Sequence, residues 1–263
     1  MHMELTGKRA FVSGSTRGIG FAVAAALLDE GASVVVNGRA QATVDQAVQR
    51  LRAAVAGADV SGIAADFERP GEVARLLDSL GDVDVLVNNV GMFGVAAFDE
   101  ISDDDWQRYF DVNVMSGVRL SRHVIGAMLA RDSGRIIFIG SESGVNVPAD
   151  MLHYGMSKAG MLAVSNGLAK LTRGTRVTVN TVLGGPTFSD GVARAVDQIA
   201  TAQGMPPGDL KAAIASANQT SLLQRFIEPA EIANLVVYLA SPLSSATNGA
   251  ALRADGGVLT TIV

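Results

Sequence analysis

A tyrosine and a lysine in the segment Tyr154-Gly155-Met156-Ser157-Lys158 have the spacing of a proton-transfer pair. Residues four apart lie on the same face of a helix. A lysine held near a phenol stabilises the phenolate and lowers the tyrosine pKa from its unperturbed value of about 10. Ser141 lies thirteen residues upstream, after an apolar run. This combination indicates an oxidoreductase site in which Tyr154 gives or takes a proton near neutral pH.

A glycine-rich turn near the start of the chain could hold a phosphate group. It follows a strand-like run, opens a helical segment, and consists of Gly14, Ser15, Thr16, Arg17, Gly18, Ile19 and Gly20. Glycines at such a turn let the backbone approach a pyrophosphate, and the helix N-terminus presents N–H groups to it. The spacing G-x-x-x-G-x-G therefore predicts a dinucleotide site. The alternative is a glycine-rich turn that binds no ligand.

The end of the second strand-like run indicates which nicotinamide dinucleotide would bind. NAD-binding proteins usually have an acidic residue there for the ribose 2′-hydroxyl, but this chain has Gly38 and Arg39. Arg17, in the glycine turn, is expected near the same end of the cofactor. Two guanidinium groups without a carboxylate favour a 2′-phosphate, so we predict NADP(H). The alternative is that Arg39 is a solvated loop residue.

Short apolar runs and longer helical segments alternate along the chain, and they must position these residues. The strand-like runs are 9–13, 33–37, 60–64, 83–88, 135–140, 176–182 and 250–253, and the helical segments are 18–30, 41–56, 70–80, 102–130, 151–171 and 229–240. Nearly continuous apolar runs are typical of parallel strands buried on both faces. We therefore predict an α/β fold: one Rossmann-like, doubly wound parallel sheet of about seven strands flanked by helices, in a single domain over 1–263. The irregular segment 184–225 is predicted to form small mobile helices that act as a substrate lid.

Composition excludes several other classes of protein. The chain has 263 residues, 48% of them apolar, and a net charge of −5. It has no basic run longer than two residues, so nucleic acid is not expected as a partner. Nor does it have the roughly 20 apolar residues in a row that a membrane helix needs. With no cysteine and three scattered histidines, no metal site is predicted. We expect a cytoplasmic protein and interpret Met1-His2-Met3 as a cloning remnant.

Further motifs occur in the order found in short-chain dehydrogenases/reductases. They are Asp66 after the third strand, Asn88-Asn89-Val90-Gly91 after the fourth, Asn113 in a long helix, Ser141, Tyr154 and Lys158, then Val179-Asn180, Gly185-Pro186-Thr187 and Asp255-Gly256-Gly257. The chain resembles that family over essentially its full length, and in particular its NADP-preferring, 3-oxoacyl reductase-like members.

The resemblance implies a role for each matching residue. Asn113, Ser141, Tyr154 and Lys158 would form a catalytic tetrad, in which Lys158 also bonds the nicotinamide ribose and Asn113 holds a water molecule. Asp66 and the Phe67 backbone would contact the adenine, and Asn89 and Gly91 would lie along the adenosine ribose. Thr187 and Ser189 would hold the nicotinamide carboxamide. The family commonly forms homotetramers, so a homotetramer or homodimer is expected, with segments 102–130 and 151–171 at the interface.

Three residues depart from the family pattern. Val90 replaces the usual alanine, Gly184-Gly185 replaces the usual Pro-Gly, and Glu142 directly follows the predicted catalytic serine. We expect Gly184 to loosen the loop over the nicotinamide and Glu142 to place a carboxylate near the site mouth. The function predicted is an NADPH-dependent carbonyl reductase acting on a small ketone or the matching secondary alcohol. The alternative is a non-catalytic NADPH-binding regulator or scaffold.

Overall fold

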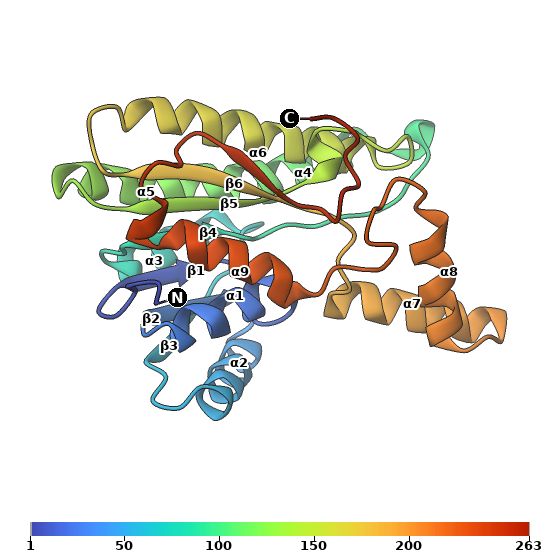
Figure 1. Cartoon of the computed structure of the whole chain (residues 1–263), viewed down its shortest axis with the longest axis horizontal. Helices are drawn as coiled ribbons and strands as arrows, with labels where there is room; N and C mark the ends of the chain where they lie inside the picture. The colour runs from blue at the N-terminus through green and yellow to red at the C-terminus, as the bar shows by residue number, and fades with distance from the viewer. Residues whose placement is uncertain (1, 263) are drawn as a thin grey trace.

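The computed structural model describes residues 2–262 and is built around one parallel sheet of seven strands (Figure 1). The strands are β1 (Arg9–Val12), β2 (Ser33–Gly38), β3 (Val60–Ala64), β4 (Val85–Asn88), β5 (Arg135–Ser141), β6 (Thr178–Gly184) and β7 (Ala251–Ala254). Their order in the sheet is β3-β2-β1-β4-β5-β6-β7, and every neighbouring pair is parallel. The predicted doubly wound Rossmann-like sheet is confirmed. The carboxyl ends of all seven strands lie at one edge, where the chain order reverses between β1 and β4, and ligands bind at such switch points.

Helices cover both faces of the sheet and divide the core in two. The helices are α1 (Gly18–Asp29), α2 (Gln41–Ala54), α3 (Pro70–Leu80), α4 (Asp103–Tyr109), α5 (Ser116–Ala130), α6 (Leu152–Leu171), α7 (Asp190–Gln203), α8 (Pro207–Ala217) and α9 (Pro229–Ala240). One cluster of buried side chains packs α1, α2 and α9 on one face. The other packs α3, α5 and α6 on the opposite face. Every residue of β4, β5 and β6 is buried, which explains why these runs are apolar rather than alternating.

The long helix predicted over 102–130 is interrupted. Between α4 and α5, residues Phe110–Met115 form a π-helical turn, which is wider than an α-turn and is frequent at functional sites. Asn113 lies in this turn and is fully buried. The wide turn allows the Asn113 side chain to face the loop after β4. The helical periodicity of 3.6 residues in the sequence did not predict this turn.

Gly184 has a different role from the one predicted. We expected it to loosen a loop, but it lies within β6, where it pairs with Ser141 of β5 and Ala254 of β7. The close approach occurs at Gly185, where a Cβ atom would lie 2.5 Å from the carbonyl oxygen of Asp255. Glycine is required there because any side chain would collide with the backbone after β7.

The segment after β6 contains two helices, as predicted for the irregular region. In Figure 1, α7 and α8 lie together beside the end of the sheet, away from the helices that cover its faces. They contact each other, and Ser189 accepts a hydrogen bond from the backbone of Val192 at the start of α7. The lid function of this segment stays a prediction.

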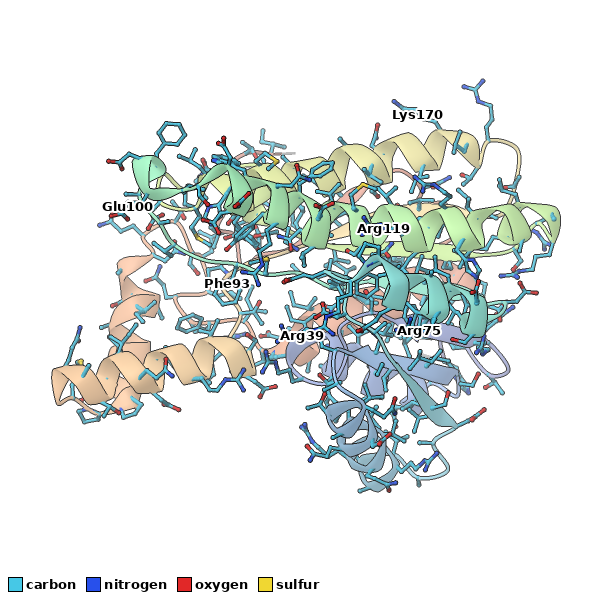
Figure 2. The ribbon with its side chains drawn as sticks, turned by 180° about the vertical axis from the view of Figure 1, so that it is seen from behind. Arg39, Arg75, Phe93, Glu100, Arg119 and Lys170 are labelled. Carbon is cyan, nitrogen blue, oxygen red and sulfur yellow. The ribbon has the colours of Figure 1, made fainter. Side chains whose placement is uncertain are left out.

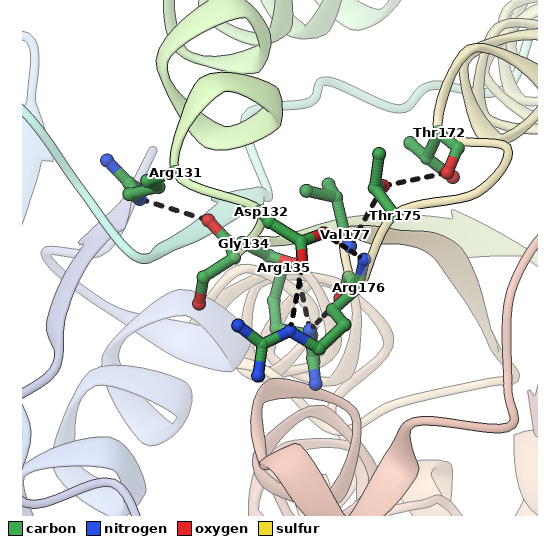
Figure 3. A network of polar contacts seen from close by, with 9 residues as sticks. Arg131, Asp132, Gly134, Arg135, Thr172, Thr175, Arg176 and Val177 are labelled. Carbon is green, nitrogen blue, oxygen red and sulfur yellow. Dashed lines mark hydrogen bonds and ion pairs between the residues drawn. The ribbon is translucent and has the colours of Figure 1, made fainter.

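A polar network joins β5 and β6 at the opposite, amino-terminal edge of the sheet (Figure 3). Arg135, 9% exposed, donates to the carbonyl oxygens of Gly134, Arg176 and Ser241 at 2.9, 2.9 and 3.3 Å. Asp132 accepts from both the backbone and the guanidinium of Arg176, at 2.7 and 3.0 Å. These bonds fix how the two strands enter the sheet.

Candidate active site

A cavity of about 480 Å³ opens at the carboxyl edge of the sheet. Its wall includes fourteen of the predicted residues: Gly14, Thr16, Arg17, Gly18, Ile19, Gly20, Arg39, Asp66, Phe67, Asn89, Gly91, Tyr154, Lys158 and Ser189. Among the described residues, Ser15, Asn113, Ser141 and Thr187 lie outside this wall. The glycine turn, the β2 end and the Tyr-Lys pair therefore face one space, although about 140 residues of sequence separate the first from the last.

The glycine turn keeps its shape through side chains from two neighbouring strand ends. Gly14 and Gly18 have φ of +61° and +58°, values that glycine adopts without strain. The Asn37 side chain accepts from the Gly14 N–H at 3.1 Å. The Asn89 side chain donates to the carbonyl oxygens of Ser13 and Gly14 at 3.0 and 2.9 Å.

These contacts also show where only glycine fits. A Cβ atom on Gly20 would lie 2.5 Å from Asn89 Nδ2, and one on Gly38 would lie 2.5 Å from Thr16 Cγ2. The backbone forms a cradle that side chains would fill, which is the condition for close approach of a pyrophosphate. The residues of the turn therefore fit a dinucleotide.

Two predicted binding residues instead support the turn from behind. Ser15 is fully buried; its hydroxyl donates to the carbonyl of Val12 at 2.6 Å and accepts from the Asn37 N–H at 2.9 Å. Asn89 uses its side-chain N–H groups on the turn itself. Ser13 and Asn37 also support the turn, and neither of them was given a role in the sequence analysis.

An acidic side chain from α7 contacts the start of α1. Asp190 Oδ2 accepts from the Gly18 N–H at 2.7 Å, so a carboxylate satisfies a free donor at the positive end of the helix. The two residues are 172 positions apart, and no local pattern could have predicted the contact.

Two arginines lie where the glycine turn and the end of β2 meet the cavity. Arg17 and Arg39 are both exposed and both line the cavity. Arg39 is visible from the face shown in Figure 2, as is Phe93, another cavity residue. No carboxylate of the described residues pairs with either guanidinium at salt-bridge distance, so both keep their donors for a ligand.

The region predicted to contact adenine is closed by an ion pair that sequence reasoning missed. Arg108, from α4, donates to Glu68 Oε1 through Nε and Nη2 at 3.1 and 2.9 Å. Both side chains line the cavity beside Asp66 and Phe67. Phe67 is buried, and Asp66 accepts from the Glu68 N–H at 3.0 Å. The loop after β3 is therefore tied to α4 across this end of the cavity.

Lys158 extends from α6 into a buried position near the Tyr154 ring. It is 5% exposed and its Nζ donates to the carbonyl of Ile139 at 2.9 Å. The Nζ lies 5.7 Å from the Tyr154 ring centroid. Burial lowers the lysine pKa to about 8, against a smaller opposing effect of Glu142. This group can therefore exchange a proton close to neutral pH.

The predicted pKa of Tyr154 was wrong in direction. Burial raises the pKa of its phenol to about 12; the nearby Ser141 hydroxyl opposes this, and the Glu142 carboxylate adds to it. Loss of water around the phenol is the largest of these effects. Tyr154 is accordingly held in its protonated form at neutral pH, the form needed in a proton donor.

Ser141 is bonded to the residue that follows it. At the end of β5, its hydroxyl donates to Glu142 Oε2 at 2.5 Å and accepts from the Ser143 N–H at 3.1 Å. The Ser143 hydroxyl donates to Glu142 Oε1 at 3.2 Å. The predicted carboxylate near the site is therefore present, and it contacts the serine directly.

Asn113 connects the loop after β4 to α6. Its Oδ1 accepts from the Met92 N–H at 2.8 Å, and its Nδ2 donates to the Met92 carbonyl at 3.0 Å and to Ser157 Oγ at 2.8 Å. Both side-chain N–H donors are used. A Cβ on Gly91 would be 3.5 Å from Lys158 Nζ and 3.6 Å from Asn113 Oδ1, so these two groups approach the same glycine.

The residues predicted near the nicotinamide lie at the base of α7. Thr187 is 9% exposed and donates to the carbonyl of Gly185 at 2.8 Å. Ser189 lines the cavity at the start of α7. Val90 also lines it and packs on the glycine turn, since a Cβ on Gly14 would lie 3.1 Å from Val90 Cγ2.

Comparison with known proteins identifies the family. The model of the short chain dehydrogenase family matches residues 8–200. The chain belongs to this family. It is 44% identical to the uncharacterized oxidoreductase YvrD of Bacillus subtilis (strain 168), over 98% of this chain and 99% of that protein. It is 34% identical to the D-beta-hydroxybutyrate dehydrogenase of Cupriavidus necator (strain ATCC 17699), over 96% and 98% of the two chains.

A solved structure agrees with this assignment. L-sorbose reductase from Gluconobacter frateurii, complexed with NADPH and L-sorbose, superposes with a TM-score of 0.92 at 30% identity and covers 100% of both chains. This short-chain dehydrogenase is thus an oxidoreductase that uses a nicotinamide cofactor. No helix within residues 2–262 is long and apolar enough to cross a membrane.

Proposed function

We propose that this short-chain dehydrogenase is an NADPH-dependent carbonyl reductase that acts on a small ketone or the matching secondary alcohol. One observation carries the proposal: Tyr154 and Lys158 line the same cavity as the glycine turn and Arg39. A proton donor and a dinucleotide cradle therefore share one space, as hydride transfer to a carbonyl requires.

The chain's own residues supply the proton and the alignment. When bound, the reduced nicotinamide supplies a hydride to the carbonyl carbon. Tyr154 donates its O–H proton to the carbonyl oxygen, which gives the alcohol. Lys158, with a pKa of about 8, returns a proton towards the phenolate. Ser141 orients the carbonyl oxygen, and Asn113 holds the Met92 backbone and α6 in position. These four roles are part of the proposal.

The preference for NADPH is supported by charge. Arg17 and Arg39 line the cavity with free donors, and a 2′-phosphate is a strong partner for a guanidinium. The complex of L-sorbose reductase with NADPH supports the same choice. In our proposal Thr187 and Ser189 hold the nicotinamide carboxamide, and Asp66 and Phe67 contact the adenine.

A free small ketone is favoured over a carrier-bound one. The similarity to a structure that contains L-sorbose supports a small substrate. Relatives at about 31% identity include a 3-oxoacyl-[acyl-carrier-protein] reductase of Vibrio cholerae, so carrier-bound substrates belong in the test. The net charge of −5 gives no overall attraction to an acidic carrier protein.

Assembly and location are part of the same proposal. We infer a homotetramer or homodimer that packs through the faces of α5 and α6; Phe110, in the wide turn before α5, and Leu171, at the end of α6, are exposed. Light scattering of the purified protein would measure its mass; a monomer would contradict this. The segment 184–225 is proposed as a lid. A cytoplasmic location stays a prediction that cell fractionation would test.

The test is to follow NADPH oxidation by absorbance across a panel of free ketones and 3-oxoacyl thioesters, with NADH alongside. Turnover of one class, faster with NADPH, is expected. Equal saturation by NADH would contradict the cofactor assignment. NADPH binding, measured by fluorescence, without turnover of any ketone would favour the non-catalytic regulator.

A further inference from the structure

Glu142 lies where an anion is unfavourable for the proposed chemistry. Its carboxylate accepts from the Ser141 hydroxyl at 2.5 Å and from the Ser143 hydroxyl at 3.2 Å. The side chain is only partly buried. Like Ser141, it lies outside the wall of the 480 Å³ cavity, but its charge acts on Tyr154, which belongs to that wall. It follows directly on β5, at the carboxyl edge of the sheet.

The donor of Ser141 is already used. A serine hydroxyl has one proton, and in the structure that proton goes to Glu142. The Ser141 oxygen also accepts the Ser143 N–H at 3.1 Å. Ser141 can help a carbonyl oxygen only if its proton turns away from Glu142. Some other donor must then bond the carboxylate.

The charge of Glu142 also hinders reduction unless another donor bonds the carboxylate. Reduction places negative charge on the carbonyl oxygen in the transition state, and a nearby carboxylate opposes that charge. Its field reaches the site, since it contributes to the raised pKa of Tyr154 and supports the charge of Lys158. A plain ketone brings nothing to offset it.

We propose that Glu142 is a specificity-determining residue that selects neutral ketones with a hydroxyl group on the carbon next to the carbonyl. The substrate hydroxyl donates to the Glu142 carboxylate in a charge-assisted hydrogen bond. Ser141 is thereby released to donate to the adjacent carbonyl oxygen. The inference rests on the proposed reductase function and names the substrate class of that site.

The surroundings favour a neutral hydroxyl over a charged group. An ammonium group at this point would lie close to Lys158, which is buried and positively charged below its pKa of about 8. A carboxylate on the substrate would be repelled by Glu142 itself. A hydroxyl donates to the carboxylate and adds no charge to the site.

The test compares ketones that differ in one group. Hydroxyacetone and butanone have the same shape, and the first has a hydroxyl where the second has a methyl. Pyruvate and dimethylaminoacetone supply the anionic and cationic counterparts. The ratio of kcat/KM for hydroxyacetone to that for butanone is measured for the wild type, Glu142→Gln and Glu142→Ala. Asp150→Asn is the matched control, because it removes an exposed carboxylate from the loop between Gly144 and α6.

One hydrogen bond to a charged group corresponds to a factor of about 10 to 100. We expect the ratio to fall by about that factor in Glu142→Ala and by about tenfold in Glu142→Gln, with butanone reduced as fast or faster than by the wild type. Asp150→Asn should keep the wild-type ratio. The comparison uses ratios within each variant, so the intrinsic reactivity of hydroxyacetone and a loss of folded enzyme both cancel.

Other results have distinct meanings. If the wild type reduces ketones but the ratio is unchanged in both Glu142 variants, the inference is overturned and the proposed function survives. The same holds if pyruvate or dimethylaminoacetone is the preferred substrate. If no ketone is reduced while NADPH binds, the proposed function fails and the inference fails with it.

Discussion

The two edges of the sheet carry polar networks of opposite kinds. At the amino edge, Arg135 directs its guanidinium at three backbone carbonyl groups, and Figure 3 includes two of these residues, Gly134 and Arg176. At the carboxyl edge, Ser141, Glu142, Tyr154 and Lys158 lie together, and the pKa values of Tyr154 and Lys158 are displaced in opposite directions. β5 connects the two networks within seven residues.

The two networks differ in the groups that their buried side chains contact. The partners of Arg135 are backbone carbonyls, which do not titrate, so this buried arginine can only hold strands together. At the other edge, ionisable side chains face one another in a buried space, and their protonation depends on each other. Burial of a polar group alone is therefore not a sign of function. A polar group buried among other titratable groups is a better indication of a functional site.

Removing the phenol should break the carboxyl-edge network most severely. Tyr154→Phe keeps the ring but removes the proton donor, and general acid catalysis is worth about 10²- to 10⁴-fold. We expect kcat to fall by that factor while NADPH still binds, as measured by steady-state kinetics and cofactor fluorescence. Turnover close to that of the wild type would show that Tyr154 is not the acid.

A substitution in the amino-edge network should lower the free energy of unfolding and leave activity nearly unchanged. Arg135→Met removes three hydrogen bonds, but the Gly134 and Ser241 carbonyls keep donors from Thr178 and Ser244. The Arg176 carbonyl loses its donor, and an unsatisfied buried group costs about 1–3 kcal/mol. We therefore expect a loss of about 1–3 kcal/mol in the free energy of unfolding, measured in urea, with kcat per folded molecule within about twofold of the wild type.

A neighbouring arginine supplies the control. Arg176→Ala removes an exposed ion pair with Asp132, and such pairs contribute about 0–1 kcal/mol. If this variant lost as much stability as Arg135→Met, burial would not be the deciding difference. If Arg135→Met lost activity without losing stability, the two edges would not be functionally separate.

The lysine should link pH to stability. Folded Lys158 has a pKa of about 8, whereas the ordinary pKa of lysine is 10.5. Between these values the unfolded state binds more protons, so the free energy of unfolding rises with pH. At one pKa unit per 1.36 kcal/mol, the full rise is on the order of 3 kcal/mol. Above about pH 10 the raised pKa of Tyr154 acts in the opposite direction.

Urea unfolding from pH 7 to pH 10 measures this effect. Lys158→Met should abolish the rise, and its stability at pH 7 should be equal to or above that of the wild type, because it removes a buried charge. The same pH slope in both proteins would mean that Lys158 is not the group responsible.

The smallest expected change concerns the cofactor. Arg39→Asp replaces a guanidinium at the adenosine end by the carboxylate that favours a ribose 2′-hydroxyl. We expect the ratio of kcat/KM for NADPH to that for NADH to fall by about 10- to 100-fold, as for one charge-assisted hydrogen bond. An unchanged ratio would assign the discrimination to other residues, Arg17 first.

The parallel sheet, the glycine turn and the Tyr-Lys pair were predictable because each depends on short-range pattern. Continuous apolar runs come from strands buried on both faces, and the glycine spacing reflects the positive φ of Gly14 and Gly18. Asp190, Arg108 and Asn37 were not predictable as site residues, since each meets its partner across 23 or more positions. The pKa of Tyr154 was misjudged because burial, which no spacing reveals, outweighs a lysine 5.7 Å from the ring centroid.

The wide turn at Phe110–Met115 makes the site sensitive to length as well as to residue type. Each residue of an α-helix advances the chain by about 100°. Deleting one residue there would let α4 and α5 merge into one regular helix with little rotation between them, because the wide turn uses one more residue than α-turns for nearly the same advance. Asn113 would lose its place in the wide turn and with it the hydrogen bonds to Met92 and Ser157. Trp106 and Tyr109, whose rings lie 6.2 and 4.0 Å from that of His153, would keep these contacts. A scan of substitutions would pass over this dependence, whereas a scan of single deletions would find it.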